Sequence, residues 1–291
     1  MSSTMSIIGP GGVGGIVAGA LFQASIPVQV VARPSTASII AERGLRVRSA
    51  QFGEFTAKIP AVTEPSPGSA IIIATKAYSL PEIAESVAAA KPTQVIALCN
   101  GVAHIEQVAA MDPTAACGSI RIFAERTEPG VIVQHTPQSL IVIPEAAWDG
   151  PVARSLIAAG FNVAKGGTEE QVLWEKLSML SPLALLTAGT GSTIGQALSA
   201  ESEFAEGLVA EVAALAARSG ANVSAESVMS LLRSLEPDST SSLARDVAAG
   251  NRTELAALGS QVADLAEKAG LAHDYLSAAV ARVADRIEGE R

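Results

Sequence analysis

The stretch GPGGVGGIVAGAL, from Gly9 to Leu21, decides how the first half of this sequence is interpreted. It follows a short apolar run, Met5 to Ile8, and continues into residues that suit a helix, Gly15 to Ser25. A glycine-rich run of this kind can bind a phosphate group, act as a flexible linker or simply form a tight turn. The spacing of the glycines and the segments around them distinguish these interpretations.

Three of these glycines have the spacing G-x-G-x-x-G between a predicted strand and a predicted helix. In such a unit the first glycine permits the tight turn, the second lets the backbone approach a pyrophosphate, and the third lets the helix pack closely on the strand. The free N–H groups and the positive end of the helix dipole then face the phosphates. The alternative is an ordinary glycine turn, but a second apolar run, Val28 to Ala32, follows at a distance typical of a dinucleotide site. The predicted cofactor-binding residues are Gly9, Gly11, Gly12, Val13 and Gly14.

Arg33 directly follows the second predicted strand, in the stretch VVARP. NAD enzymes usually place a carboxylate there to hold the ribose 2′-hydroxyl, whereas the first carboxylate after this strand is Glu42. A guanidinium complements a 2′-phosphate, so the sequence favours NADP (NADPH) over NAD. The alternative is that Arg33 is a solvated surface residue.

Short β-rich runs alternate with helical ones through the rest of the first half, as at Ala70 to Thr75 and Val95 to Cys99. This alternation predicts a parallel sheet with right-handed crossovers. Beyond Gly118, β-rich runs separated by turn residues predict an antiparallel meander that finishes the sheet. From Thr168 onward, apolar stripes at helical spacing replace the strands.

The sequence therefore predicts two domains, divided at the stretch KGGT. The first, residues 1–167, is an α/β Rossmann-type NADP-binding domain whose parallel sheet is extended by antiparallel strands. The second, residues 168–291, is an all-α domain for substrate binding and dimerisation. Its Ala/Leu-rich helices make a homodimer the expected assembly.

Composition excludes several classes of partner. The 291 residues are 48% apolar, enough for a substantial core. A formal net charge of -9 and an aromatic content of 3% argue against nucleic acid, which requires clustered basic residues or stacking platforms. No stretch reaches the roughly 18 uninterrupted apolar residues of a membrane span, and the first residues lack the pattern of a signal peptide. We expect a cytoplasmic protein with a small-molecule partner, and we expect Cys99 and Cys117 to be buried, reduced thiols.

Hydride transfer from a nicotinamide to a carbonyl needs a group that polarises and protonates the oxygen. His104, His135 and His273 are scattered, without catalytic or metal-ligand spacing, so no metal site is predicted. Lys176, in VLWEKLSML, lies on an apolar helix just after the domain boundary. A charge there is costly unless it has a partner or a function, although lysine stems also reach solvent harmlessly.

Taken together, these residues resemble the ketopantoate reductase (2-dehydropantoate 2-reductase) family, nearly end to end. The resemblance rests on IIGPGGVGG, on Arg33, on ATKAYSL with Lys76, on LCNGV with Asn100, on WEKL with Lys176, and on SSLARDVAAGNRTE with Ser242, Asp246 and Glu254. The first motif is shared with many dehydrogenases, whereas the last is quite specific.

The resemblance implies an NADPH-dependent reduction of a 2-oxo acid to a 2-hydroxy acid, at a site between the two domains. Lys176 would be the general acid, and Glu254 would position the substrate and Lys176. Asn100 would hold the substrate and nicotinamide side, Lys76 would lie near the cofactor, and Ser242 would bind the substrate carboxylate. Simpler alternatives exist: Asn100 capping a turn with the next glycine, Ser242 as a helix N-cap, and Glu254 as a solvated acid at a helix start.

The sequence departs from the family at two helical positions after Lys176. The family usually has asparagines four and eight residues later, where this sequence has Leu180 and Ala184. Ser178 and Ser181 lie on other faces of a regular helix, although a distortion at Pro182 could bring Ser181 inward.

The loss of these polar groups predicts a more apolar substrate pocket, lined by Leu180 and Ala184. Such a pocket no longer selects for a substrate that carries a hydroxyl group. The substrate is then ketopantoate or a more hydrophobic 2-oxo acid. Two alternatives stay open: a catalytically inactive NADP-binding module or redox sensor, and a dehydrogenase of a β-hydroxy acid or an imine.

Overall fold

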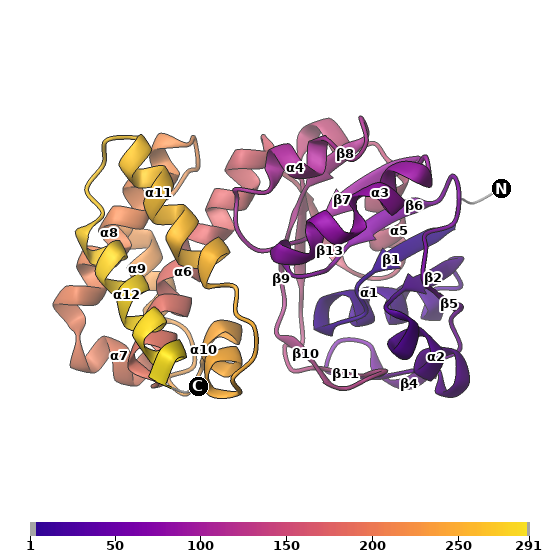
Figure 1. The fold of residues 1–291 in the computed structure, drawn as a ribbon, viewed down its shortest axis with the longest axis horizontal. Helices are drawn as coiled ribbons and strands as arrows, with labels where there is room; N and C mark the ends of the chain where they lie inside the picture. The colour runs from indigo at the N-terminus through magenta and orange to yellow at the C-terminus, as the bar shows by residue number, and fades with distance from the viewer. Residues whose placement is uncertain (1–3, 290–291) are drawn as a thin grey trace. The chain divides into compact units, whose positions relative to one another are not determined.

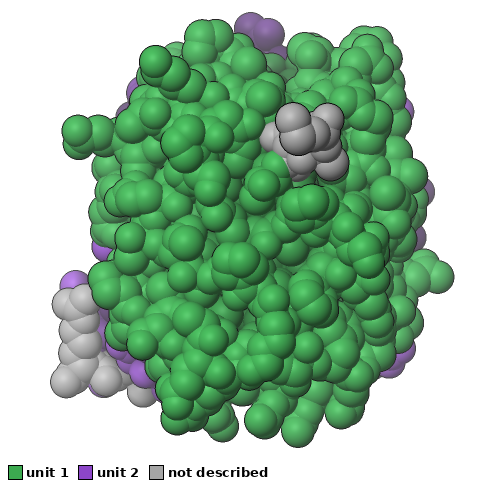
Figure 2. Space-filling view, turned by 90° about the vertical axis from the view of Figure 1, so that its right-hand side faces the viewer, with its two compact units in different colours: residues 1–99, 104–172 green, residues 100–103, 173–291 purple. Residues whose placement is uncertain are grey.

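The computed structural model describes residues 4–289, which form two compact units (Figure 1). Unit 1 contains the described residues up to Cys99 and then His104–Val172. Unit 2 contains Asn100–Ala103 and the described residues from Leu173 onward. Figure 2 shows the two units in different colours. The division at residue 172 lies within helix α6 (Glu169–Thr190), and a loop from the first half of the chain belongs to unit 2.

A six-stranded parallel sheet in the order β5-β2-β1-β6-β7-β8 forms the centre of unit 1. Its strands are β1 (Met5–Ile8), β2 (Val28–Val31), β5 (Ala61–Val62), β6 (Ala70–Ile73), β7 (Gln94–Ala97) and β8 (Ala115–Cys117). The helices of the unit are α1 (Gly12–Gln23), α2 (Pro34–Arg43), α3 (Leu80–Ala89), α4 (Ile105–Ala109) and α5 (Pro151–Ala158), with short 3-10 turns η1 (Ala77–Ser79) and η2 (Glu145–Ala147). The predicted Rossmann-type α/β class with additional strands is confirmed.

The additional strands differ in detail from the predicted meander, because they form two smaller sheets of mixed pairing. One has the order β10-β11-β3-β4 and the other β13-β12-β9. Their strands are β3 (Leu45–Ser49), β4 (Gly53–Ala57), β9 (Ser119–Arg121), β10 (Ala124–Glu128), β11 (Val131–Gln134), β12 (Leu140–Ile143) and β13 (Asn162–Lys165). The chain leaves the central sheet between β8 and β9 at Gly118, where a Cβ atom would lie 2.9 Å from the Val142 carbonyl oxygen.

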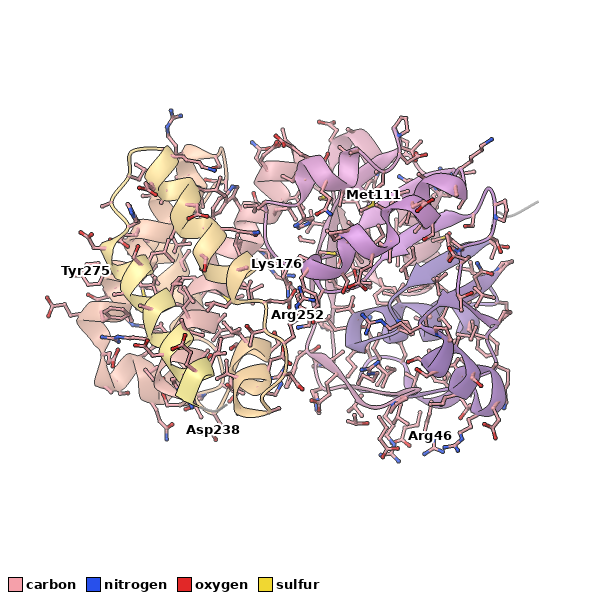
Figure 3. All side chains as sticks on the ribbon, viewed as in Figure 1. Arg46, Met111, Lys176, Asp238, Arg252 and Tyr275 are labelled. Atoms are coloured by element: carbon pink, nitrogen blue, oxygen red, sulfur yellow. The ribbon has the colours of Figure 1, made fainter. Side chains whose placement is uncertain are left out.

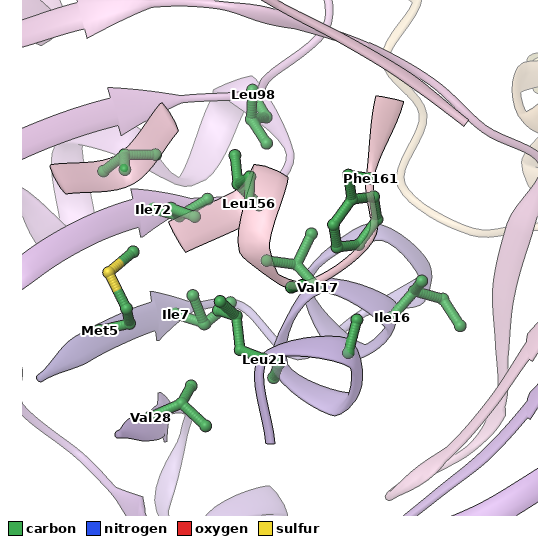
Figure 4. Close-up of a cluster of buried hydrophobic side chains, with 14 of the residues drawn as sticks. Met5, Ile7, Ile16, Val17, Leu21, Val28, Ile72, Leu98, Leu156 and Phe161 are labelled. Atoms are coloured by element: carbon green, nitrogen blue, oxygen red, sulfur yellow. The ribbon is translucent and has the colours of Figure 1, made fainter. Parts of the chain in front are cut away.

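Helix α1 is buried on almost every side. Ile16, Val17 and Leu21 are fully buried in a cluster with side chains from β1, β2, β6 and α5 (Figure 4). The opposite side of the helix approaches the β10-β11-β3-β4 sheet so closely that glycine is required. A Cβ atom at Gly15 would lie 2.4 Å from Ile132 Cγ1, and one at Gly19 would lie 2.8 Å from Val47 Cγ2. The glycines beyond the G-x-G-x-x-G pattern therefore serve packing.

Within its described residues, unit 2 consists of helices joined by loops and contains no strand. Its helices after α6 are α7 (Ile194–Ala200), α8 (Ser202–Arg218), α9 (Ala225–Arg233), α10 (Ser242–Ala248), the π-helix η3 (Ala256–Ser260), α11 (Gln261–Lys268) and α12 (Asp274–Gly289). The buried carboxylate of Glu211 in α8 accepts the backbone N–H groups of Tyr275 and Leu276, so α12 is capped from a neighbouring helix.

Within residues 4–289, no single helix is long and apolar enough to cross a membrane. The pair α6 and α7, bent by 80°, passes that test by length and composition only.

Candidate active site

The glycine loop has the local geometry that its spacing predicts. Gly9 follows β1 with φ of +88°, a left-handed conformation that favours glycine. The Gly11 N–H donates to the Gly9 carbonyl oxygen over 2.8 Å, and α1 begins at Gly12. A Cβ atom at Gly14 would lie 2.2 Å from the Gly9 oxygen, so only glycine lets the helix approach the turn this closely. At Gly11, by contrast, a Cβ atom would point into open space.

This loop fits a bound pyrophosphate. The first turn of α1 consists of glycine and valine, and in any α-helix the first N–H groups have no intrahelical acceptor. Open space at Gly11 leaves the backbone accessible to an anion at the positive end of the helix dipole. The loop also lies where the strand order reverses, between β1 and β6, which is where parallel α/β sheets bind their ligands. The arrangement therefore suits a dinucleotide cofactor.

The two basic residues predicted near the cofactor follow β2 and β6, the strands on either side of β1 in the central sheet of unit 1. Arg33 is the N-cap residue of α2 and is exposed, and its Nη2 atom lies 3.2 Å from Oε2 of Glu82 in the first turn of α3. Lys76 is half-buried and precedes η1, after β6. No pattern in the sequence indicates this pairing of Arg33 with a carboxylate.

Three of the predicted site residues form one hydrogen-bonded chain within unit 2. Nζ of Lys176, labelled in Figure 3, donates to Oδ1 of Asn100 over 2.7 Å. Nδ2 of the same amide donates to Oε2 of Glu254 over 3.2 Å. Lys176 and Asn100 are half-buried, whereas Glu254 has only 3% of its surface exposed. The interpretation of Glu254 as a solvated acid is therefore wrong, and the Asn100 side chain is used in a tertiary contact.

Close packing fixes the backbone around this hydrogen-bonded chain of side chains. Gly101 follows Asn100 with φ of +94°, and a Cβ atom there would lie 3.0 Å from the Ala257 carbonyl oxygen. The Asn100 loop therefore packs on η3, the π-helix that begins two residues after Glu254. Oγ of Ser181 donates to the Leu258 carbonyl oxygen of η3 over 2.7 Å. Single π-helical turns are frequent at functional sites.

Ser242 is not the N-cap of its helix, contrary to the simpler alternative for that residue. Ser241 is the N-cap of α10: its Oγ accepts the Ala244 N–H over 3.0 Å and the Thr187 hydroxyl over 2.8 Å. Ser242 is the first helical residue and is half-buried. Because Ser241 supplies the cap, the Ser242 hydroxyl is not needed for it. Asp246, also half-buried, lies one turn later in the same helix.

Helix α6 continues without a break through Pro182, so Lys176, Leu180 and Ala184 share a face at intervals of four residues. Leu180 is half-buried, and Ala184 has 1% of its surface exposed. Ser181 is fully buried and bonded to η3, so it does not substitute for the missing asparagines. Ser178 donates to the Glu175 carbonyl oxygen of its own helix.

The structure also places both cysteines and two of the three histidines. Cys99 and Cys117 form no disulfide and are buried, as predicted, and burial together with Glu169 raises the pKa of the Cys117 thiol well above its usual range. His135 pairs with Glu125, and His273 contacts the Leu271 carbonyl oxygen. The described residues contain no group of three or more His, Cys, Asp or Glu side chains suited to a metal ion.

Comparison with known proteins gives two family matches that together span most of the chain. The model described as Ketopantoate reductase PanE/ApbA matches residues 5–148, and Ketopantoate reductase PanE/ApbA C terminal matches residues 170–286. The chain is 26% identical over 268 residues to the uncharacterized oxidoreductase YkpB of Bacillus subtilis (strain 168), covering 85% of this chain and 87% of that protein.

Solved structures share the fold over the whole chain. A PanE/ApbA family ketopantoate reductase from Ralstonia eutropha JMP134 superposes with a TM-score of 0.88 at 23% identity, covering 99% of each chain. A D-mandelate dehydrogenase in a ternary structure with NADH and anilino(oxo)acetate superposes with a TM-score of 0.89 at 19% identity, again covering 99% of each chain.

Proposed function

Because this chain belongs to the ketopantoate reductase PanE/ApbA family, we propose that it reduces a 2-oxo acid to the corresponding 2-hydroxy acid with NADPH. The chain is an oxidoreductase acting on CH–OH groups, in common with its family. The observation that carries the proposal is the hydrogen-bonded chain from Lys176 through Asn100 to Glu254. It gives the cationic amine a fixed position beside a neutral amide, as a proton donor requires.

The cofactor would be held by the backbone of the glycine loop, Gly9 to Gly14, with Lys76 nearby and the 2′-phosphate on Arg33. When bound, the nicotinamide supplies a hydride to C2 of the substrate. Lys176 donates a proton from Nζ to the carbonyl oxygen, which becomes the hydroxyl of the product, and recovers that proton from water. Asn100 keeps the amine oriented through Oδ1, while Glu254 keeps the amide oriented through Nδ2.

The carboxylate of the substrate would contact polar and charged residues, whereas its side chain would contact apolar ones. Ser242 would hydrogen-bond the carboxylate, and the positive charge of Lys176 would attract it. Leu180 would face the side chain of the substrate, because it lies one helical turn from Lys176 on the same face of α6. Ala184 is buried, so its effect would be the absence of a polar group more than a direct contact. We therefore propose a hydrophobic 2-oxo acid as a better substrate than hydroxylated ketopantoate.

The test is oxidation of NADPH with a panel of 2-oxo acids that includes ketopantoate and branched and aromatic members. We expect the highest kcat/KM for a hydrophobic member. Lys176→Ala should lower kcat by about a hundredfold or more, the usual scale for a general acid. Lys268→Ala is the matched control, since Lys268 is an exposed lysine of the same unit.

Failure of the whole panel to turn over, with NADPH still bound, would contradict the proposal and leave a cofactor-binding module. Turnover of ketopantoate alone would contradict only the substrate preference. The homodimer stays a prediction, which light scattering on the purified chain would test.

A further inference from the structure

We propose that Glu82 weakens the preference for NADP(H) that Arg33 confers, so that this chain also binds NAD(H). The inference rests on the proposed function, because it assumes that Arg33 lies at the adenosine ribose of the cofactor. It assigns to Glu82 the role of a specificity-determining residue.

The carboxylate of Glu82 lies beside Arg33, at the end of β2, where the sequence directly after that strand supplies no acidic residue. Arg33 follows β2 directly, and the next acidic side chain in sequence, Glu42, lies in the last turn of α2. Glu82 comes from a different part of unit 1, the first turn of α3 after β6, and its Oε2 atom lies 3.2 Å from Nη2 of Arg33. The carboxylate that NAD enzymes usually carry at the end of the second strand is thus supplied from another loop.

Both side chains are available to a ligand. The Arg33 side chain is 78% exposed and the Glu82 side chain 53% exposed. Exposed ion pairs of this kind are weak, so a bound phosphate can displace the carboxylate without a large penalty. Glu82 lies in the first turn of α3, where the positive end of the helix dipole favours a negatively charged side chain.

The two cofactors would use this pair differently. An unphosphorylated ribose offers hydroxyl donors, which the Glu82 carboxylate accepts while Arg33 stays paired. A 2′-phosphate competes with Glu82 for the guanidinium and is repelled by the carboxylate at short range. The pair therefore favours NAD(H) and disfavours NADP(H) relative to an arginine standing alone.

The test is binding of NADPH and NADH in the absence of substrate, followed by the fluorescence of the reduced nicotinamide. Glu82→Gln should raise the ratio of Kd for NADH to Kd for NADPH by about fivefold, and the increase should shrink at high salt. Glu85→Gln removes the same charge from an exposed position one turn along α3 and should leave the ratio within about twofold. Arg33→Gln should lower the ratio.

Equal ratios in the Glu82→Gln and Glu85→Gln variants, with NADPH still bound tightly, would overturn the role of Glu82 alone. Equal ratios in wild type and Arg33→Gln would overturn the placement of Arg33 at the 2′-phosphate, and with it the role of Glu82, whereas 2-oxo acid reduction is decided separately by the substrate panel. A wild-type chain that binds neither nucleotide would overturn both the role of Glu82 and the proposed function.

Discussion

The glycine loop of unit 1 and the hydrogen-bonded chain of Lys176, Asn100 and Glu254 in unit 2, here called the lysine chain, are built in opposite ways. The loop is local: its geometry comes from the backbone of six consecutive residues, Gly9 to Gly14, and from the absence of side chains. The lysine chain joins Lys176 to Asn100 and Asn100 to Glu254, pairs that are 76 and 154 residues apart. A local site is constrained by steric exclusion, whereas a distributed site depends on the tertiary structure that brings its members together. Substitutions in the two regions should therefore fail for different reasons.

The sharpest test of the loop compares two of its glycines. Gly14→Ala should lower the free energy of unfolding by about 3 kcal/mol, because the new Cβ would lie 2.2 Å from the Gly9 carbonyl oxygen. Gly11→Ala should change that free energy by less than about 0.5 kcal/mol, since its Cβ meets open space. It should nevertheless raise the Kd for NADPH on the order of tenfold, because the backbone can no longer approach the pyrophosphate. Urea denaturation and nucleotide titration measure the two effects separately.

If both alanine variants lose stability equally, the open space at Gly11 is not available to a ligand and the contrast between the two glycines is wrong.

A change at Asn100 tests whether the lysine chain acts as a unit. Asn100→Asp keeps the shape but replaces the donor to Glu254 by a second carboxylate, so two acidic groups face each other across 3.2 Å. We expect kcat to fall on the order of tenfold near neutral pH. Uptake of one proton by the pair restores a donor, so activity relative to wild type should recover as the pH falls. The measurement is a kcat profile for both proteins over the same pH range.

An Asn100→Asp profile parallel to that of the wild type would show that the Asn100–Glu254 bond has no part in catalysis.

The smallest expected effect concerns the hydrogen bond that joins α6 to η3, the π-helix that begins two residues after Glu254. Ser181→Ala removes the buried hydrogen bond to the Leu258 carbonyl oxygen of η3, which should cost about 1 kcal/mol of unfolding free energy. Ser178→Ala is the matched control on the same helix, because Ser178 is equally buried but bonds only within its own turn. Its cost should stay under about 0.5 kcal/mol. Comparable losses in the two variants would show that η3 does not depend on Ser181.

The contrast between a local loop and a distributed hydrogen-bonded chain also explains how much of each region can be predicted from the sequence. The fold class and the glycine turn were predictable, since strand-helix alternation and glycine spacing act over short distances. The pairing of Arg33 with Glu82 and the bridge through Asn100 were not, because no local pattern specifies which distant side chains meet. Gly15 and Gly19 looked like part of an apolar helix, and only the second sheet packed on α1 explains why they lack side chains.

The N-cap of α10 shows, at a single residue, how far the sequence alone can predict the structure. Ser241 and Ser242 are adjacent at the start of the helix, and by residue type either could serve as its N-cap. The buried contact from Thr187 to Ser241 selects one of them, and that contact comes from a helix more than fifty residues away. The family motif identified Ser242 as a functional candidate, but the structure supplies the reason why it is released from capping.

The membership of Asn100–Ala103 in unit 2 has a consequence for how this protein can be taken apart. Unit 2 is discontinuous in sequence, so the chain crosses between the units three times. A fragment starting near residue 173 would carry Lys176 and Glu254 but would lack the amide that joins them. Chimeras that exchange C-terminal halves between relatives would inherit this loop from the wrong parent. Successful recombination would have to transplant residues 100–103 together with the helical half they complete.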